Sequence, residues 1–258
     1  MHLKTTPVVS FSLINLLVAL SSAESVSSRD TSSCPSVWTT IATDLKSTFV
    51  ADNGTCTSDA RAAIRLSFHD CFPEACDGSI ILADECSSRV ENTQLVDICT
   101  TIGDKATQYN VSTADMIQFG AAMGIASCPG GPAISFYAGR TDTSIANPES
   151  QIPNRTSNAS VLISQFAAKG FTAAELVALV GAHTTARQLS GTALDSTPGT
   201  WDADFYSQTS SNSAPSSLDS DRFLSNSSET SDTWTSTGAS ASAFSDAFVP
   251  ALLKRHKQ

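Results

Sequence analysis

The sequence predicts a mainly α-helical protein. Apolar residues recur at helical spacing in several segments, cap residues precede two of these segments, and no alternation of period two runs for more than a few residues. The 258 residues are 41% hydrophobic and only 16% charged, which gives ample length for a buried core and argues against global disorder. We expect one domain over 24–258, with helical halves at about 34–145 and 146–258.

Residues 1–23 are typical of a secretory signal peptide. Lys4 precedes an apolar run from Val8 to Leu20, and small residues follow as far as Ala23. A membrane anchor fits poorly, because the run is short and polar residues interrupt it. Cleavage would remove Lys4 and take the formal net charge from −10 to −11, which argues against a nucleic-acid partner. We therefore expect a secreted, extracellular monomer that has no membrane partner.

Two helices are expected in the first third of the mature chain, over 35–50 and 58–70. The second of them is rich in alanine and arginine. In the first, four apolar residues share one face at intervals of four. These are Val37, Ile41, Leu45 and Phe49.

Two further helices are expected over 112–124 and 172–187, each with a cap at its start. Asp115 follows the possible cap Ser112 by three residues, and Glu175 follows Thr172 in the pattern of a capping box. A last short helix is expected over 244–253. Segments 140–160 and 188–232 are rich in Ser, Thr, Asn, Asp and Pro and predict long loops.

The cysteines and the glycosylation motifs are both consistent with secretion. Seven cysteines in the first half predict about three disulfides and one remaining thiol, with a connectivity that spacing alone does not give. They are Cys34, Cys56, Cys71, Cys76, Cys86, Cys99 and Cys128. Five sequons predict a glycosylated surface. They begin at Asn53, Asn110, Asn154, Asn158 and Asn226.

Two of the four histidines have chemically suggestive neighbours. On a helix, Arg65 and His69 project from one face, which places a cation beside an imidazole that can transfer a proton. A helix-end cation beside a packing histidine is the structural alternative. His183 ends an apolar stripe and should face the interior, either as a packed histidine or with a metal on one ring nitrogen and a carboxylate on the other.

A short loop after His69 offers oxygen ligands. Asp70, Asp77 and Ser79 lie within ten residues, and Gly78 permits a tight turn between them. Carboxylate, hydroxyl and carbonyl oxygens in such a loop can bind Ca²⁺. Any one of these residues by itself would instead indicate a solvent-exposed turn.

Seven motifs in a fixed order resemble the secreted haem peroxidases of fungi, the class II-like group of the plant-type superfamily, in a short ascomycete-like form. The motifs are "RLSFHDC", "CDGSIIL", "ADMIQF", "CPGGP", "GRTD", "ELVALVGAHTTAR" and "DSTPGTWDADFY". The resemblance runs from "CPSVW" to the last helix. It implies the plant-type peroxidase fold, in which two helical halves with little β structure enclose a buried haem b.

The resemblance also implies roles for individual residues. Arg65 and His69 would act on peroxide, Phe68 would pack over the haem, and Asn92 would orient His69. His183 would bind the haem iron, Asp221 would hold its other nitrogen, and Arg187 would contact a propionate. One Ca²⁺ would be bound by Asp70, Asp77, Ser79 and the Ala75 carbonyl. A second Ca²⁺ would be bound by Thr184, Asp195, Thr197, Asp202 and the Thr200 carbonyl.

Departures from the family narrow the expected substrate. Ala178 stands where lignin and versatile peroxidases carry a surface tryptophan, and Ser58, Ala62 and Leu189 stand where manganese peroxidases carry acids. The expected reaction is therefore one-electron oxidation of small phenolic donors by hydrogen peroxide, without a Mn²⁺ site. Trp201 and Tyr206 are expected to pack rather than to relay electrons.

The resemblance favours the disulfides Cys71–Cys76 and Cys56–Cys128, and it suggests that Glu85 braces the first calcium site. Two alternative functions are less consistent with the sequence. A catalytically silent haem- or calcium-binding protein of the same fold is disfavoured, because Arg65, His69 and His183 are all present. A zinc hydrolase is disfavoured because no compact zinc motif occurs.

Overall fold

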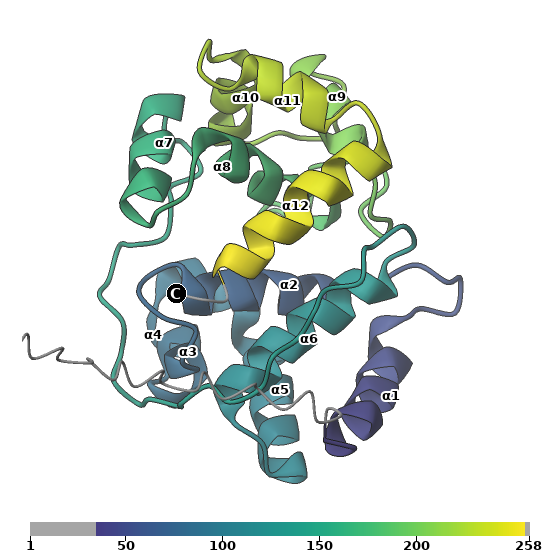
Figure 1. Ribbon diagram of the computed structural model, residues 1–258, viewed down its shortest axis with the longest axis vertical. Coiled ribbons are helices and arrows are strands. Elements are labelled where there is room, and N and C mark those ends of the chain that lie inside the picture. Colours follow the sequence, from purple (N-terminus) through teal and green to yellow (C-terminus); the bar gives the residue numbers. More distant parts are fainter. Residues whose placement is uncertain (1–34, 256–258) are drawn as a thin grey trace, which may run out of the picture. The chain divides into compact units, whose positions relative to one another are not determined.

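The computed structural model describes residues 35–255, and α-helices dominate this part of the chain (Figure 1). In order the helices are α1 (Val37–Phe49), α2 (Ser58–Cys71), α3 (Ser79–Leu82), α4 (Glu85–Ser88), the 3₁₀ helix η1 (Val90–Leu95), α5 (Val96–Tyr109), α6 (Thr113–Ser127), α7 (Ala159–Ala168), α8 (Ala173–Val180), the 3₁₀ helix η2 (Gly181–Thr185), α9 (Asp204–Ser210), α10 (Asp219–Asn226), α11 (Ser231–Thr237) and α12 (Ala241–Arg255). Among the described residues, β structure is limited to two isolated bridges. The predicted fold class is confirmed, whereas the expected signal peptide and Cys34 lie outside the described residues.

The predicted helices form for the reasons that their sequences suggest. The side chains of Ile41, Leu45 and Phe49 on α1 are completely buried. Ser112 caps α6 by accepting a hydrogen bond from the Asp115 amide. The expected capping box at the start of α8 is present in both directions between Thr172 and Glu175. Local sequence therefore accounts for the starts of α6 and α8.

The loop predicted over 188–232 is wrong, because this segment contains α9, α10 and the start of α11. These helices have only seven or eight residues, which is shorter than the window over which apolar periodicity predicts a helix. They are held by tertiary contacts instead, since Phe205, Tyr206 and Leu224 are at most 1% exposed. The segment 140–160 is irregular as predicted up to the start of α7. The predicted helix over 172–187 ends at Val180 and continues as η2.

The main helix contacts fall into two groups. Helices α1–α6 pack mostly on one another, with α2 against α6 the most extensive pair, and α7–α12 pack on one another (Figure 1). Between the groups, the Phe72 and Phe166 rings lie 4.8 Å apart, and the Trp201 amide donates to the Pro129 carbonyl at 2.8 Å. Trp201 and Tyr206 are each 1% exposed, as expected for packing residues.

Two disulfides confirm the expected pairs, Cys56–Cys128 and Cys71–Cys76. The third joins Cys86 to Cys99 and closes a segment that includes η1. No single helix in the described part of the chain has both the length and the apolar character needed to cross a membrane.

The close packing of α6 on α2 depends on Gly124, since a β-carbon at this position would lie 2.5 Å from the Ala60 carbonyl oxygen. We expect Gly124→Ala to lower the free energy of unfolding by about 1–3 kcal/mol, because backbone must move to relieve the overlap. Gly103→Ala is the matched control, since its nearest neighbour is a flexible Ile81 methyl at 3.3 Å. Urea unfolding measures both variants, and equal stability for the two would contradict this account.

Candidate haem and peroxide site

The residues expected to act on peroxide lie on one face of α2 and meet a side chain from η1. Arg65 Nε donates to His69 Nε2 at 3.2 Å, and His69 Nδ1 lies 2.7 Å from Asn92 Oδ1. Arg65 is half-buried, whereas the His69 and Asn92 side chains are buried. The helix pitch brings Arg65 beside His69, and the fold brings Asn92 to the opposite nitrogen of the imidazole.

The partners of Asn92 fix the tautomer of His69. The Asn92 amide nitrogen donates to the Glu85 carbonyl at 3.1 Å, so its oxygen faces His69 and must accept a hydrogen bond. His69 therefore carries its proton on Nδ1 and has a lone pair at Nε2, which in this structure accepts the hydrogen bond from Arg65 Nε. This is the form that a general base requires.

Burial keeps this imidazole neutral. Desolvation, together with the nearby charge of Arg65, lowers the pKa of His69 to about 3, although the hydrogen bond with Asn92 acts in the opposite direction. Burial also lowers the pKa of the Arg65 guanidinium from its usual value. At neutral pH the pair therefore combines a neutral base with a cation.

The expected iron-binding histidine lies on η2, directly after α8. His183 Nδ1 is 3.0 Å from Asp221 Oδ2 and 3.1 Å from Oδ1, and the Asp221 side chain is completely buried. The Phe205 ring meets the imidazole edge-on at 5.7 Å. The His183 side chain is 31% exposed, and its Nε2 has no hydrogen-bond partner among the described residues. One ring nitrogen is thus fixed by a carboxylate and the other is available as a ligand.

This donor set fits a haem. A partnerless imidazole nitrogen whose ring is oriented by a buried carboxylate is a typical arrangement for an iron ligand. Phe68 projects from α2 between Phe72, at 4.9 Å, and Phe166 of α7, at 6.4 Å. Arg187 is exposed, and its Nη1 donates to the Gly191 carbonyl at 2.9 Å.

The first expected calcium site contains a buried carboxylate oxygen without a partner. Asp70 Oδ2 accepts from the Gly78 amide at 3.3 Å, but Oδ1 has no hydrogen-bond partner within residues 35–255. Desolvation is the main cause that raises the pKa of Asp70 to about 8. Asp77 Oδ1 accepts from the Ser79 amide at 3.1 Å, which forms the turn that Gly78 permits with φ of 77°. An orphaned carboxylate in an oxygen-rich turn fits a bound cation.

The second expected calcium site brings four side chains together. Thr184 Oγ1 lies 3.1 Å from Asp195 Oδ2 and 3.3 Å from Asp202 Oδ1. Thr197 Oγ1 lies 2.7 Å from Asp195 Oδ1 and 2.8 Å from Asp202 Oδ2. Burial is the main cause that raises the pKa of Asp195. Nowhere in residues 35–255 do three or more His, Cys, Asp or Glu side chains gather around one point, so any cation here would also need hydroxyl and carbonyl ligands.

The sequence did not predict a network that joins the first expected calcium site to Asn92. Glu85 Oε1 accepts from the Asn147 amide at 2.8 Å, and Oε2 pairs with Arg89 at 2.7 Å. The Asn147 side chain donates to Ser79 Oγ at 2.7 Å. The resemblance suggests Glu85 as a brace, but Asn147 lies 62 residues further along the chain and no sequence signal connects the two.

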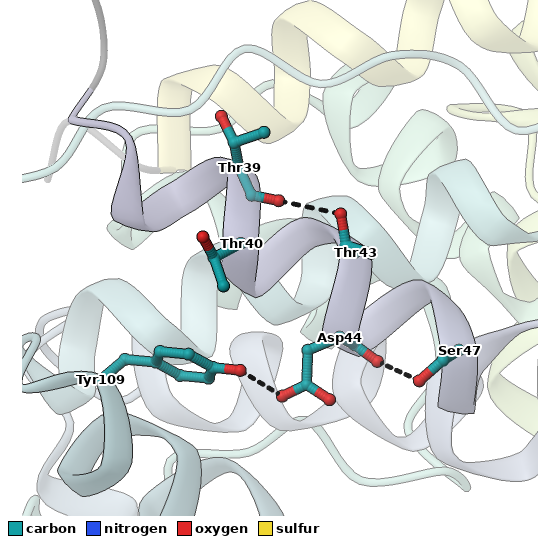
Figure 2. Close-up of a pocket in the computed structure, with 6 residues that line it drawn as sticks. All are labelled: Thr39, Thr40, Thr43, Asp44, Ser47 and Tyr109. Carbon is teal, nitrogen blue, oxygen red and sulfur yellow. Dashed lines mark hydrogen bonds between the residues drawn. The ribbon is translucent and has the colours of Figure 1, made fainter.

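Two surface pockets lie away from this chemistry. The first has a volume of about 490 Å³, and Figure 2 shows hydroxyl side chains of α1 around Asp44, which accepts from Tyr109 at 2.8 Å. Asp44 also pairs with Lys105 at 2.6 Å. The second is formed by parts of α7 and α10 and the turn after α10. Neither pocket includes a residue expected to contact haem, peroxide or calcium.

Comparison with known proteins agrees with the geometry. A family model described as "Peroxidase" matches residues 40–240. Manganese peroxidase 3 of Phlebia radiata is 32% identical over 189 residues, which cover 64% of this chain and 52% of the relative. The peroxidase of Arthromyces ramosus is 32% identical over 197 residues, which cover 67% of this chain and 53% of the relative.

A low-redox potential peroxidase of Taiwanofungus camphoratus is 36% identical over 140 residues, which cover 52% of this chain and 42% of the relative. The chain thus spans about half the length of the curated relatives that it matches. The family model nevertheless covers most of the chain, including α2 and η2 with their histidines. This chain therefore belongs to the peroxidase family, and within that family to the fungal class II haem peroxidases.

Proposed function

We propose that this chain is a secreted haem peroxidase that reduces hydrogen peroxide and oxidises small phenolic or other aromatic donors. One observation carries the proposal: a neutral imidazole beside a cation occurs in the same fold as a second imidazole that has one free nitrogen and one carboxylate-bound nitrogen. Family membership supports haem as the cofactor.

His183 would hold the iron through Nε2, and Phe68 and Arg187 would contact the rest of the haem. Asp221 would accept a hydrogen bond from the Nδ1–H of His183, which orients the ring and makes it a more electron-rich ligand. The bound haem would supply the redox chemistry, accepting electrons one at a time from the donors.

The chain's own residues would move the proton. His69 would accept one proton of hydrogen peroxide at Nε2 and return it to the departing oxygen, which then leaves as water. Arg65 would offset the negative charge that develops on this oxygen. Asn92 would keep the His69 proton on Nδ1, so that Nε2 is ready for each cycle.

The donor is proposed to be organic rather than Mn²⁺. Ser58, Ala62 and Leu189 provide no carboxylate to bind a divalent cation. In the sequence, Arg61 lies between Ser58 and Ala62. Burial lowers the pKa of Arg61, and the nearby positive charge of Arg187 lowers it further. Because the positive charges of Arg61 and Arg187 repel each other, an anion such as a haem carboxylate is favoured over a cation beside them.

An absorption spectrum and a turnover assay test this function. The purified protein should show a Soret band after haem loading, and it should oxidise a phenolic dye when peroxide is added. A panel of Mn²⁺, veratryl alcohol and simple phenols should show activity with the phenols. A Soret band without turnover would instead indicate a silent haem protein, and a protein without haem would contradict the proposal.

We also propose that two Ca²⁺ ions support the site, the first through Asp70, Asp77, Ser79 and the Ala75 carbonyl. The second would bind through Thr184, Asp195, Thr197, Asp202 and the Thr200 carbonyl. The orphaned Asp70 oxygen supports the first ion, and the paired Asp195 and Asp202 support the second.

Calcium removal should lower the thermal midpoint, because Asp70 then remains buried without a cation. In the calcium-free protein the pKa of Asp70 is raised from 3.8 to about 8. Between these values the folded chain binds more protons than the unfolded chain, so stability should fall as pH rises from about 4 to about 8. Thermal melts with EGTA at several pH values measure this dependence, which Asp70→Asn should remove. The same melting curve with Ca²⁺ as with EGTA would refute the first calcium site.

A further inference from the structure

The guanidinium group of Arg65 is held at three nitrogens by neutral acceptors. Nε donates to His69 Nε2 at 3.2 Å, Nη1 donates to Gln94 Oε1 at 2.6 Å, and Nη2 donates to the Glu91 carbonyl at 3.1 Å. Among the described residues, no carboxylate forms an ion pair with Arg65. The cation is therefore fixed in direction, while its charge is not neutralised.

Gln94 is the side chain outside the reacting pair that accepts a hydrogen bond from the Arg65 guanidinium. Of the three acceptors, His69 is itself part of the reacting pair and Glu91 contributes only a backbone oxygen. The hydrogen bond to Gln94 is also the shortest of the three. All three have the charged guanidinium as their donor, which makes them stronger than hydrogen bonds between neutral groups. A glutamate at position 94 would hold Arg65 as well but would offset its charge.

The segment that carries Gln94 is anchored at both ends. The Cys86–Cys99 disulfide closes it, and η1 within it presents Glu91, Asn92 and Gln94. These three residues contact the two reacting side chains, since Asn92 contacts His69 and the other two contact Arg65. Closing a short loop limits the positions that its residues can sample.

We propose that Gln94 is a positioning residue that holds the Arg65 guanidinium in place to receive negative charge at the peroxide site. The proposal rests on the proposed function, because it gives Arg65 the role of binding a developing anion. A preorganised donor stabilises such charge better than one that must first be ordered. Loss of the Gln94 oxygen should therefore weaken the binding of any anion that Arg65 contacts.

Fluoride binding by the haem-loaded protein tests the proposal, since fluoride is an anionic iron ligand whose affinity depends on nearby donors. Gln94→Met keeps a similar side-chain volume without the oxygen, and it should weaken fluoride binding about fivefold to tenfold. Arg65→Leu sets the largest loss expected. Ser88→Ala is the matched control, because Ser88 is exposed in the same closed segment and its hydroxyl makes no hydrogen bond to any residue that the structure describes.

A spectroscopic measurement separates positioning from a loss of structure. The C–O stretching frequency of carbon monoxide on the reduced haem falls as positive charge approaches, so it should rise in Gln94→Met and stay at the wild-type value in Ser88→Ala. The Gln94 side chain is exposed, so thermal midpoints should not change. Fluoride affinity within about twofold of wild type in Gln94→Met would overturn this inference and leave the proposed function intact. Failure of the wild-type chain to take up haem would overturn both.

Discussion

His69→Ala is expected to leave haem uptake unchanged and to slow the reaction with peroxide by about a hundredfold to ten-thousandfold. The substitution removes the lone pair at Nε2 that would accept the peroxide proton. Haem uptake should persist because His183 and Asp221 belong to η2 and α10, away from the α2 face that carries His69. Stopped-flow absorption in the Soret region measures the rate constant.

The controls for this prediction separate the base from its surroundings. His256→Ala changes a histidine of the C-terminal tail and should leave the rate constant unchanged. Asn92→Ala should slow the reaction less than His69→Ala does. It removes the acceptor that keeps the His69 proton on Nδ1, but the imidazole itself remains. A rate constant for His69→Ala equal to that of wild type would remove His69 from the mechanism.

His183→Gly is expected to abolish stable haem retention, so that desalting removes the Soret band. The substitution takes away the one imidazole that the described structure orients through a buried carboxylate. It also leaves Asp221 buried without its partner, which should lower the free energy of unfolding. Added imidazole can fill the resulting space and should restore the Soret band in part. A variant that retains haem as well as wild type without imidazole would refute the assignment.

Asp221→Asn provides a graded test of the same site. Asparagine can still accept a hydrogen bond from the Nδ1–H of His183, so haem should be retained. The negative charge is lost, so His183 becomes a less electron-rich ligand and the iron should reduce at a more positive potential. Spectroelectrochemical titration measures the shift. An unchanged potential would limit Asp221 to a structural role.

Several features could be predicted from sequence because they depend on local patterns. These patterns involve residues at most four positions apart, or repeats of that interval. They are the apolar face of α1, the caps of α6 and α8 and the helix face shared by Arg65 and His69. The order of the motifs predicted contacts between distant residues, which helical periodicity does not indicate. The resemblance, rather than spacing, predicted that His183 contacts Asp221, and it also predicted the two expected disulfides.

Other features could not be predicted because distant segments create them. Helices α9, α10 and α11 are too short for apolar periodicity to predict them, and the burial of residues such as Phe205 and Leu224 stabilises them. Asn147 reaches Glu85 from 62 residues away. Gln94 contacts Arg65 across 29 residues, and nothing in its local sequence distinguishes it from a surface glutamine.

The sequence by itself determined the helical class and the family, because these follow from periodicity and from the order of short motifs. The tertiary structure alone decided which atoms meet: the neutral His69 tautomer, the free nitrogen of His183, the orphaned oxygen of Asp70 and the hold of Gln94 on Arg65. The physical reason is that hydrogen-bond geometry and desolvation depend on distances between segments, and those distances exist only once the helices have packed.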